Sequence, residues 1–182
     1  MDKPWYRKWF RQTRQSDRPT TRSKADAGDP EAQCCLGFRC ASGEGEPQDF
    51  AEAARWYRLA ADQDYSLAQF NLGIMNSKGQ GFSKNDVAAA MWFEKAAQQG
   101  DPGAQYNLGM QCQRASNRGL PLEASEAKIQ AYTWYHLAAA QGYKNSAAAY
   151  ETLSLTMTSQ EVAEASRRAA TFVTGKIPPV TA

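Results

Sequence analysis

The sequence contains one histidine, four cysteines and no long apolar run. Its longest uninterrupted apolar run, at 87–93, is much shorter than the roughly 20 residues that a membrane-spanning helix needs. The basic N-terminus is not followed by an apolar segment of signal-peptide length. We therefore expect a cytoplasmic protein with neither a signal peptide nor a transmembrane segment.

The cysteines do not form a metal-binding pattern. Cys34, Cys35, Cys40 and Cys112 include no Cys-x-x-Cys pair, and no histidine lies near them at ligand spacing. A helix over 34–40 would point its three cysteines in different directions, which does not suit a disulfide. We expect reduced thiols, no metal and no cofactor.

The scarcity of histidine also argues against catalysis. His136 stands beside Trp134 and Tyr135 in an apolar helical pattern, which is typical of a packing residue rather than of a general base. No Ser-His-Asp order, phosphate loop or metal-ligand cluster occurs. We expect no catalytic residues and no enzymatic activity.

The composition is that of a globular chain, with 182 residues, 42% apolar, 22% charged and a net charge of +2. The charge is segregated along the sequence. Residues 1–24 carry eight Lys or Arg and two Asp, a net charge of +6, so the remaining residues carry −4. Because the body of the chain is acidic and contains no nucleic-acid-binding motif, we do not expect it to bind nucleic acid.

The strongest internal pattern is a repeat of 36 residues. The letters AQCCLG at 32–37 return as AQFNLG at 68–73 and as AQYNLG at 104–109. Trp56 returns as Trp92 at the same spacing. The tryptophan of the third copy, Trp134, lies six residues further along the chain than this spacing predicts. A fixed period of this length indicates an array of small, similar structural units.

Local signals predict the first helix of each unit. The Asp-Pro pairs at 29–30 and 101–102 each supply a capping carboxylate and a proline suited to the first turn. The Gly-x-Gly segments at 43–45 and 79–81 end these helices, because glycine accepts left-handed backbone angles.

A second helix follows each glycine turn. Asp49 and Asn85 occupy equivalent positions as its predicted N-caps. Gly37, Gly73 and Gly109 lie inside the first helices, where glycine costs about 1 kcal/mol relative to alanine. We expect close approach of the second helix at these glycines, since a residue without a β-carbon leaves room for it.

These motifs resemble the Sel-one-like repeat (SLR), a relative of the tetratricopeptide repeat. The likeness rests on the Ala-x-x-x-Leu-Gly core, the Gly-x-Gly turn, the Trp-Tyr or Trp-Phe pair and the Ala-Ala that follows. It implies an all-α fold, a right-handed α-solenoid of helix-turn-helix repeats. We expect a solenoid at 27–173, with repeats at about 28–63, 64–99 and 100–141, capping helices at 142–173, and a tail at 174–182.

The resemblance implies that the first helix of each pair lines a concave surface. On a helical wheel, one stripe of these helices faces away from Ala32 and Leu36. This stripe, the predicted groove, consists of Cys34, Phe38, Ser42, Phe70, Ile74, Lys78, Tyr106, Met110 and Arg114. It is apolar and ends in a small or cationic residue, which suits an acidic or amphipathic helix of a protein partner. The alternative is that its apolar members pack against the neighbouring repeat.

A basic, aromatic N-terminal arm precedes the repeats. We interpret residues 1–26 as this arm and a linker, the linker being the polar segment 15–26. The expected contact residues of the arm are Trp5, Tyr6, Arg7, Lys8, Trp9, Phe10 and Arg11. Three destinations stay open for it, namely an anionic membrane surface, an acidic partner, or the first repeat of the chain itself.

We therefore expect a non-catalytic scaffold or adaptor that holds a protein or peptide in a concave groove. The alternative is a membrane-surface-associated regulatory protein anchored by the arm. A hydrolase is the least favoured function, because the regularly spaced cysteines of the family's cysteine-rich members linked to β-lactams are absent.

Overall fold

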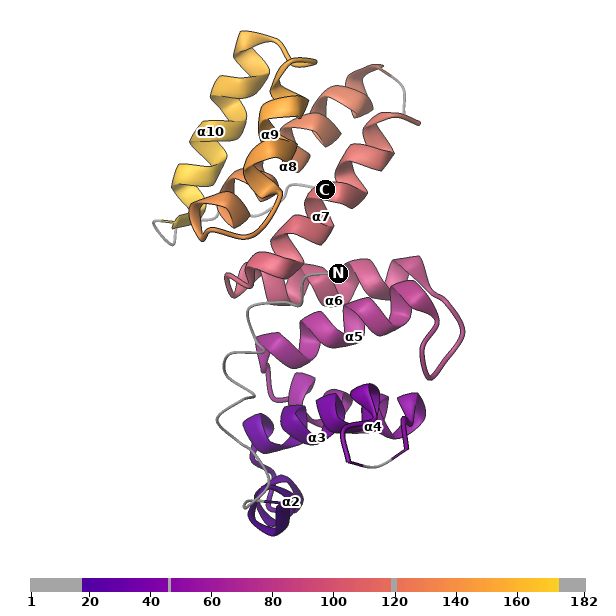
Figure 1. The fold of residues 1–182 in the computed structure, drawn as a ribbon. Coiled ribbons are helices and arrows are strands. Elements are labelled where there is room, and N and C mark those ends of the chain that lie inside the picture. The colour runs from indigo at the N-terminus through magenta and orange to yellow at the C-terminus, as the bar shows by residue number, and fades with distance from the viewer. Residues whose placement is uncertain (1–17, 46, 119–120, 174–182) are drawn as a thin grey trace. The chain divides into compact units, whose positions relative to one another are not determined.

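The computed structural model describes residues 18–45, 47–118 and 121–173, and every regular element in these ranges is an α-helix (Figure 1). The helices are α2 (Arg18–Asp26), α3 (Pro30–Ser42), α4 (Phe50–Ala61), α5 (Ser66–Lys78), α6 (Asp86–Gln98), α7 (Pro102–Ser116), α8 (Pro121–Ala140), α9 (Ser146–Ser154) and α10 (Ser159–Val173). The chain divides into two compact units at the boundary between Trp92 and Phe93, within α6. We call them the N-terminal and the C-terminal unit.

The first helices begin and end where the local signals predict. Asp29 caps α3, since its Oδ1 accepts hydrogen bonds from the amides of Glu31 and Ala32 at 2.9 and 3.1 Å. Gly43 ends α3 with φ +71°, and Gly79 ends α5 with φ +69°. These capping predictions are confirmed.

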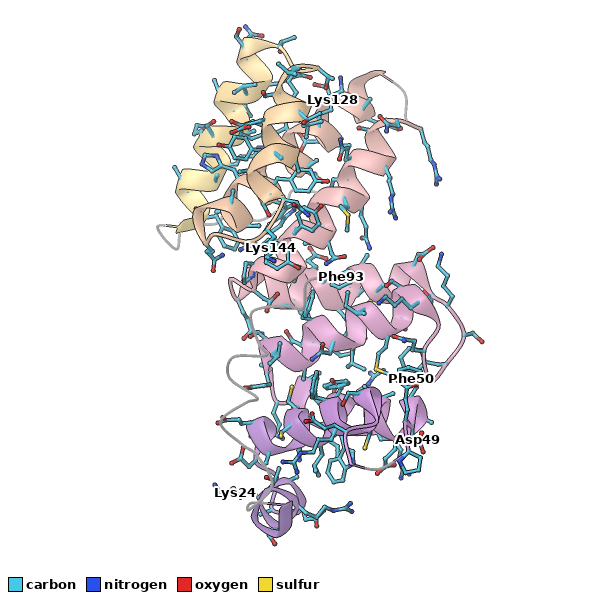
Figure 2. The ribbon with its side chains drawn as sticks, viewed as in Figure 1. Lys24, Asp49, Phe50, Phe93, Lys128 and Lys144 are labelled. Carbon is cyan, nitrogen blue, oxygen red and sulfur yellow. The ribbon has the colours of Figure 1, made fainter. Side chains whose placement is uncertain are left out.

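The turns into the second helices are built alike. Asp49, labelled in Figure 2, caps α4 by accepting hydrogen bonds from two amides of its first turn, both at 2.9 Å. Its own amide donates to the carbonyl of Cys40 at 2.9 Å, and the amide of Asn85 donates to that of Asn76 at the same distance. The same turn therefore recurs after 36 residues.

Aromatic rings explain the helical glycines. A β-carbon at Gly37 would lie 2.7 Å from the ring of Tyr57, and one at Gly109 would lie 2.6 Å from the ring of Tyr135. The predicted close approach is confirmed at these two positions. In both cases the ring belongs to the tyrosine that directly follows the tryptophan of the second helix. This contact between glycine and tyrosine was not predicted from the sequence.

The C-terminal unit is completed by α8, α9 and α10, which stand side by side in Figure 1. Thr158 and Glu161 form a capping box at the start of α10, because the amide of Thr158 donates to Glu161 Oε2 at 2.7 Å and the amide of Glu161 donates to Thr158 Oγ1 at 3.2 Å. Arg168 of α10 forms an ion pair with Glu126 of α8. The hydrogen bonds from Arg168 lower the pKa of the Glu126 carboxyl.

The expectation of a linker at 15–26 is wrong for residues 18–26, which form α2. Ala25 of this helix is buried against Trp56, and the guanidinium of Arg22 lies 5.0 Å from the centre of the Trp56 ring. At the end of α2, the amide of Asp29 donates a hydrogen bond to the carbonyl of Lys24. At the end of α6, the amide of Asp101 donates to the carbonyl of Ala96 in the same way. Helix α2 thus ends as α6, a second helix of a repeat, does, and contacts with the first repeat supply the stability that its polar composition lacks.

Candidate interaction face

The predicted groove residues of the N-terminal unit differ in exposure. Cys34 and Phe70 are buried, with 2% and 9% of their surface exposed. Phe38 and Ile74 are half-buried, and Ser42 and Lys78 are exposed. The exposed part of the stripe on α3 and α5 therefore lies toward the C-terminal ends of these helices.

Cys34 belongs to the core that α3, α4 and α5 form together. Its side chain forms a hydrogen bond with that of Asn71, and burial raises the pKa of its thiol far above the ordinary value. A thiol that stays protonated is a poor nucleophile. For Cys34 and Phe70 the alternative interpretation, packing inside the molecule, agrees with their burial.

The C-terminal unit carries three residues of the stripe, all on α7. Tyr106 and Met110 are half-buried and pack against the core of this unit, whereas Arg114 is exposed. The ring of Tyr106 lies between those of Tyr135 and Tyr143, with centroid distances of 5.4 and 5.5 Å. These spacings are typical of packed aromatic pairs.

The predicted contact residues of the arm lie outside the described residues. They are Trp5, Tyr6, Arg7, Lys8, Trp9, Phe10 and Arg11. Their role stays a prediction.

The ring of His136 packs against two tyrosine rings. Its ring stacks on that of Tyr150 at 5.4 Å and meets the ring of Tyr132 edge-on at 5.9 Å. Its buried Nδ1 has no hydrogen-bond partner within the described part of the chain, so no carboxylate there orients it as in a catalytic triad.

Over 18–45, 47–118 and 121–173, no group of three or more His, Cys, Asp or Glu side chains is arranged to hold a metal ion. Over the same residues, no helix combines the length and the apolar character needed to span a bilayer.

Three buried glutamines form a polar connection that sequence reasoning missed. The side-chain amide of Gln33 donates to the carbonyl of Ala25 at 3.1 Å. Gln69 donates to Ala61 and Gln105 to Ala97 in the same way, each at 3.3 Å. Each glutamine therefore ties a first helix to the end of the helix before it.

Two of these glutamines, Gln33 and Gln105, also bind a glutamine that directly follows their own second helix. The amide of Gln63 donates to Gln33 Oε1 at 2.9 Å, and that of Gln141 donates to Gln105 Oε1 at 3.0 Å. A buried amide needs such partners, since an unpaired one costs about 1 to 3 kcal/mol. The signal was present in the sequence, because glutamine follows alanine at the same phase of all three copies.

A pocket of about 290 Å³ opens between α2, α3 and α4 in the N-terminal unit. It is lined by Arg22, Leu36, Arg39, Cys40, Glu44, Glu52 and Trp56. Three of its lining residues, Leu36, Cys40 and Trp56, are apolar, and the other four are two arginines and two glutamates. The pocket was not anticipated, because it depends on α2.

The model of the Sel1 repeat matches residues 30–65, 66–101 and 102–143. The chain belongs to the Sel1 repeat family. The matches begin at the first residues of α3, α5 and α7, two residues after the repeat boundaries that we expected. Together with the all-helical structure, this Sel1 membership confirms the predicted fold class, an all-α solenoid of helical repeats.

Solved structures of Sel1 repeat proteins resemble the chain. A Sel1 repeat protein from Oxalobacter formigenes is 34% identical, with a TM-score of 0.60, and the match covers 76% of this chain and 99% of that protein. A protective antigen present in uropathogenic Escherichia coli strains, which displays an SLR fold, is 34% identical with a TM-score of 0.58. That match covers 67% of this chain but only 25% of the antigen. No curated protein matches the chain.

Proposed function

We propose that this Sel1 repeat chain is a non-catalytic scaffold or adaptor of the cytoplasm that binds a protein or peptide on the exposed face of its first helices. Sel1 repeats are generally protein–protein interaction modules. The four cysteines, which form no disulfide in the described structure, suit a reducing compartment.

The observation that carries the proposal is the half-exposed apolar surface on the first helices. Phe38 and Ile74 keep part of their side chains accessible in the N-terminal unit, with exposed Lys78 one turn beyond Ile74. Apolar residues beside a cation suit an amphipathic helix that carries acidic residues at its edge. Tyr106, Met110 and exposed Arg114 repeat this arrangement on α7.

The experiment is partner capture with matched variants of the full chain. Ile74→Asp places a charge on the first-helix face, and Met91→Asp places one on a second helix, where Met91 is 59% exposed. Proteins captured by the unmodified chain are identified by mass spectrometry, and each variant is compared with it. We expect Ile74→Asp to lose the captured partner and Met91→Asp to retain it, with both variants keeping the helical content of the unmodified chain.

Two results would contradict the proposed binding face. One is loss of the partner with Met91→Asp alone, which would place the binding surface on the second helices. The other is retention by both variants and also by Met110→Asp, which would leave the first helices without a role. Turnover of a substrate that disappears with His136→Ala would overturn the non-catalytic assignment.

A further inference from the structure

The pocket between α2, α3 and α4 is bounded by charges of both signs. Its four charged lining residues are Arg22 of α2, Arg39 of α3, Glu44 just after α3, and Glu52 in the first turn of α4. Their formal charges cancel. The other three lining residues are apolar, so a molecule in this pocket would meet both charges and an apolar wall.

Most of these charges are specific to the first repeat. A shift of 36 residues carries Arg39, Glu44 and Glu52 onto an uncharged methionine, glutamine and alanine at positions 75, 80 and 88. The second repeat folds into the same helical hairpin with these uncharged residues. The three charges are therefore not needed to build a repeat, which leaves room for a role in binding.

Arg22 serves the fold, but its terminal nitrogens are left over. Its guanidinium lies 5.0 Å from the centre of the Trp56 ring, as Arg58 lies 4.9 Å from that of Trp92. Its Nε donates to both carboxylate oxygens of Asp26, at 3.1 and 3.2 Å. Among the described residues, neither of its two Nη atoms has a hydrogen-bond acceptor, and such a pair of donors suits a carboxylate.

The two glutamates are similarly placed to accept hydrogen bonds. Glu52 pairs only with Arg55, through Oε2 at the long distance of 3.5 Å, and Arg55 does not line the pocket. Glu44 is exposed, and its side chain forms no hydrogen bond or ion pair with any residue that the structure describes. Both carboxylates can therefore receive an ammonium group.

The mixture of charges decides between classes of ligand. An anion would be repelled by the two glutamates and a cation by the two arginines. An uncharged apolar molecule would remove water from four charged groups without replacing its hydrogen bonds, which is costly. A zwitterion avoids both penalties, because its carboxylate and its ammonium each meet groups of the opposite sign.

The size of the pocket narrows the choice further. An apolar cavity of about 150 Å³ binds benzene, and this pocket has a volume of about 290 Å³. A phenyl-sized side chain would therefore take about half of it and leave the rest for the charged end of a small zwitterion. Half-buried Leu36 supplies an apolar wall for such a side chain.

We propose that this pocket binds an α-amino acid with an apolar side chain of the size of phenylalanine. The Nη atoms of Arg22 donate to the carboxylate of the ligand, and Arg39 adds a second positive charge. Glu44 and Glu52 accept hydrogen bonds from the ammonium, and the side chain lies against Leu36. The site does not depend on the first-helix face proposed above for a protein partner, so each can be tested alone.

The test is isothermal titration calorimetry of the full chain with phenylalanine and two analogues. Phenylpropionate lacks the ammonium, and phenylethylamine lacks the carboxylate. We expect one molecule of phenylalanine to bind per chain, at least about ten-fold more tightly than either analogue, because each analogue leaves charged groups of one sign without a partner.

Paired substitutions place the binding in the pocket. Glu44→Gln with Glu52→Gln should weaken the binding of phenylalanine about ten-fold and strengthen that of phenylpropionate, since the repelling carboxylates are gone. The matched control, Glu94→Gln with Glu151→Gln, changes two exposed glutamates that do not line the pocket and should leave both affinities unchanged. A variant that had merely lost its fold could not gain affinity for phenylpropionate.

Four results would overturn the proposal. The first is the absence of saturable phenylalanine binding up to about 10 mM, where even a Kd of millimolar order would be visible. The second is an analogue that binds as tightly as phenylalanine. The others are a pocket variant that keeps its affinity for phenylalanine or gains none for phenylpropionate, and a control variant that loses phenylalanine to the same extent.

Discussion

Asp101 is an N-cap whose carboxyl is buried. Because it is buried, the charged form of this carboxyl lowers the stability of the folded state. Only 7% of Asp101 is exposed, and its Oδ1 accepts a hydrogen bond from the amide of Ala104 at 2.7 Å. Burial raises the pKa of this carboxyl from 3.8 to about 6, although hydrogen bonds from the amides of Ala104 and Gly103 act in the opposite direction.

The sign of the effect on stability follows from this direction. Because the pKa of Asp101 is higher in the folded than in the unfolded chain, the folded state holds the proton more tightly. The stability that this proton contributes is complete below about pH 4 and is lost as the pH rises through about 6. A shift of roughly two pH units corresponds to about 3 kcal/mol at neutral pH.

Asp101→Asn removes the charge and keeps an oxygen that can cap α7. We expect the free energy of unfolding at pH 7 to rise by about 2 kcal/mol, since losing a favourable charge at the helix N-terminus offsets up to about 1 kcal/mol of the gain. At pH 4 the variant and the unmodified chain should differ by much less. Urea denaturation followed by circular dichroism between pH 4 and 8 measures both values.

The control is Asp49→Asn, which changes an exposed capping carboxylate. It should alter the free energy of unfolding at pH 7 by less than about 1 kcal/mol. An Asp101→Asn variant that is less stable than the unmodified chain at pH 7 would refute the argument from burial.

Three more substitutions test the packing and the polar contacts. Gly109→Ala should lower the free energy of unfolding by about 1 to 3 kcal/mol, because the new β-carbon meets the Tyr135 ring; an unchanged melting temperature would show that the ring moves aside freely. Gln105→Leu should cost about 1 to 3 kcal/mol in urea denaturation, because it removes the hydrogen bonds of the buried Gln105 amide to the carbonyl of Ala97 and to the amide of Gln141, and equal stability would deny the glutamines a structural role. Arg168→Met should cost no more than about 1 kcal/mol, a loss that shrinks in high salt; a larger, salt-independent loss would point to packing by the arginine stem.

Local signals allowed the helix ends to be predicted, because a cap is decided by a few neighbouring residues. Asp29 and Gly43 act within one turn of the helix that they begin or end. Helix α2 could not be predicted in this way, since its own residues are polar and its order depends on contact with Trp56, thirty residues further along the chain.

The exposure of the residues on the predicted stripe could not be predicted from the helical wheel. The helical wheel placed Phe70 and Ile74 on one stripe, yet Phe70 is buried and Ile74 is half-exposed. A wheel describes one helix by itself, whereas exposure depends on which neighbours pack over each turn. The hydrogen-bond partners of Gln33 could not be predicted either, because they lie on neighbouring segments of the fold. The sequence showed only that a glutamine recurs at this position of every repeat.

The paired glutamine contacts constrain how such a chain can grow or shrink. Each of the first two repeats receives a link from the helix before it, and its own second helix ends in the alanine that carries the next link. The link from each of these glutamines to the alanine eight residues before it recurs every 36 residues. Duplicating or deleting 36 residues between Ala25 and Gln105 keeps each glutamine eight residues after its acceptor alanine, whereas an insertion or deletion between the two residues of a link changes this spacing.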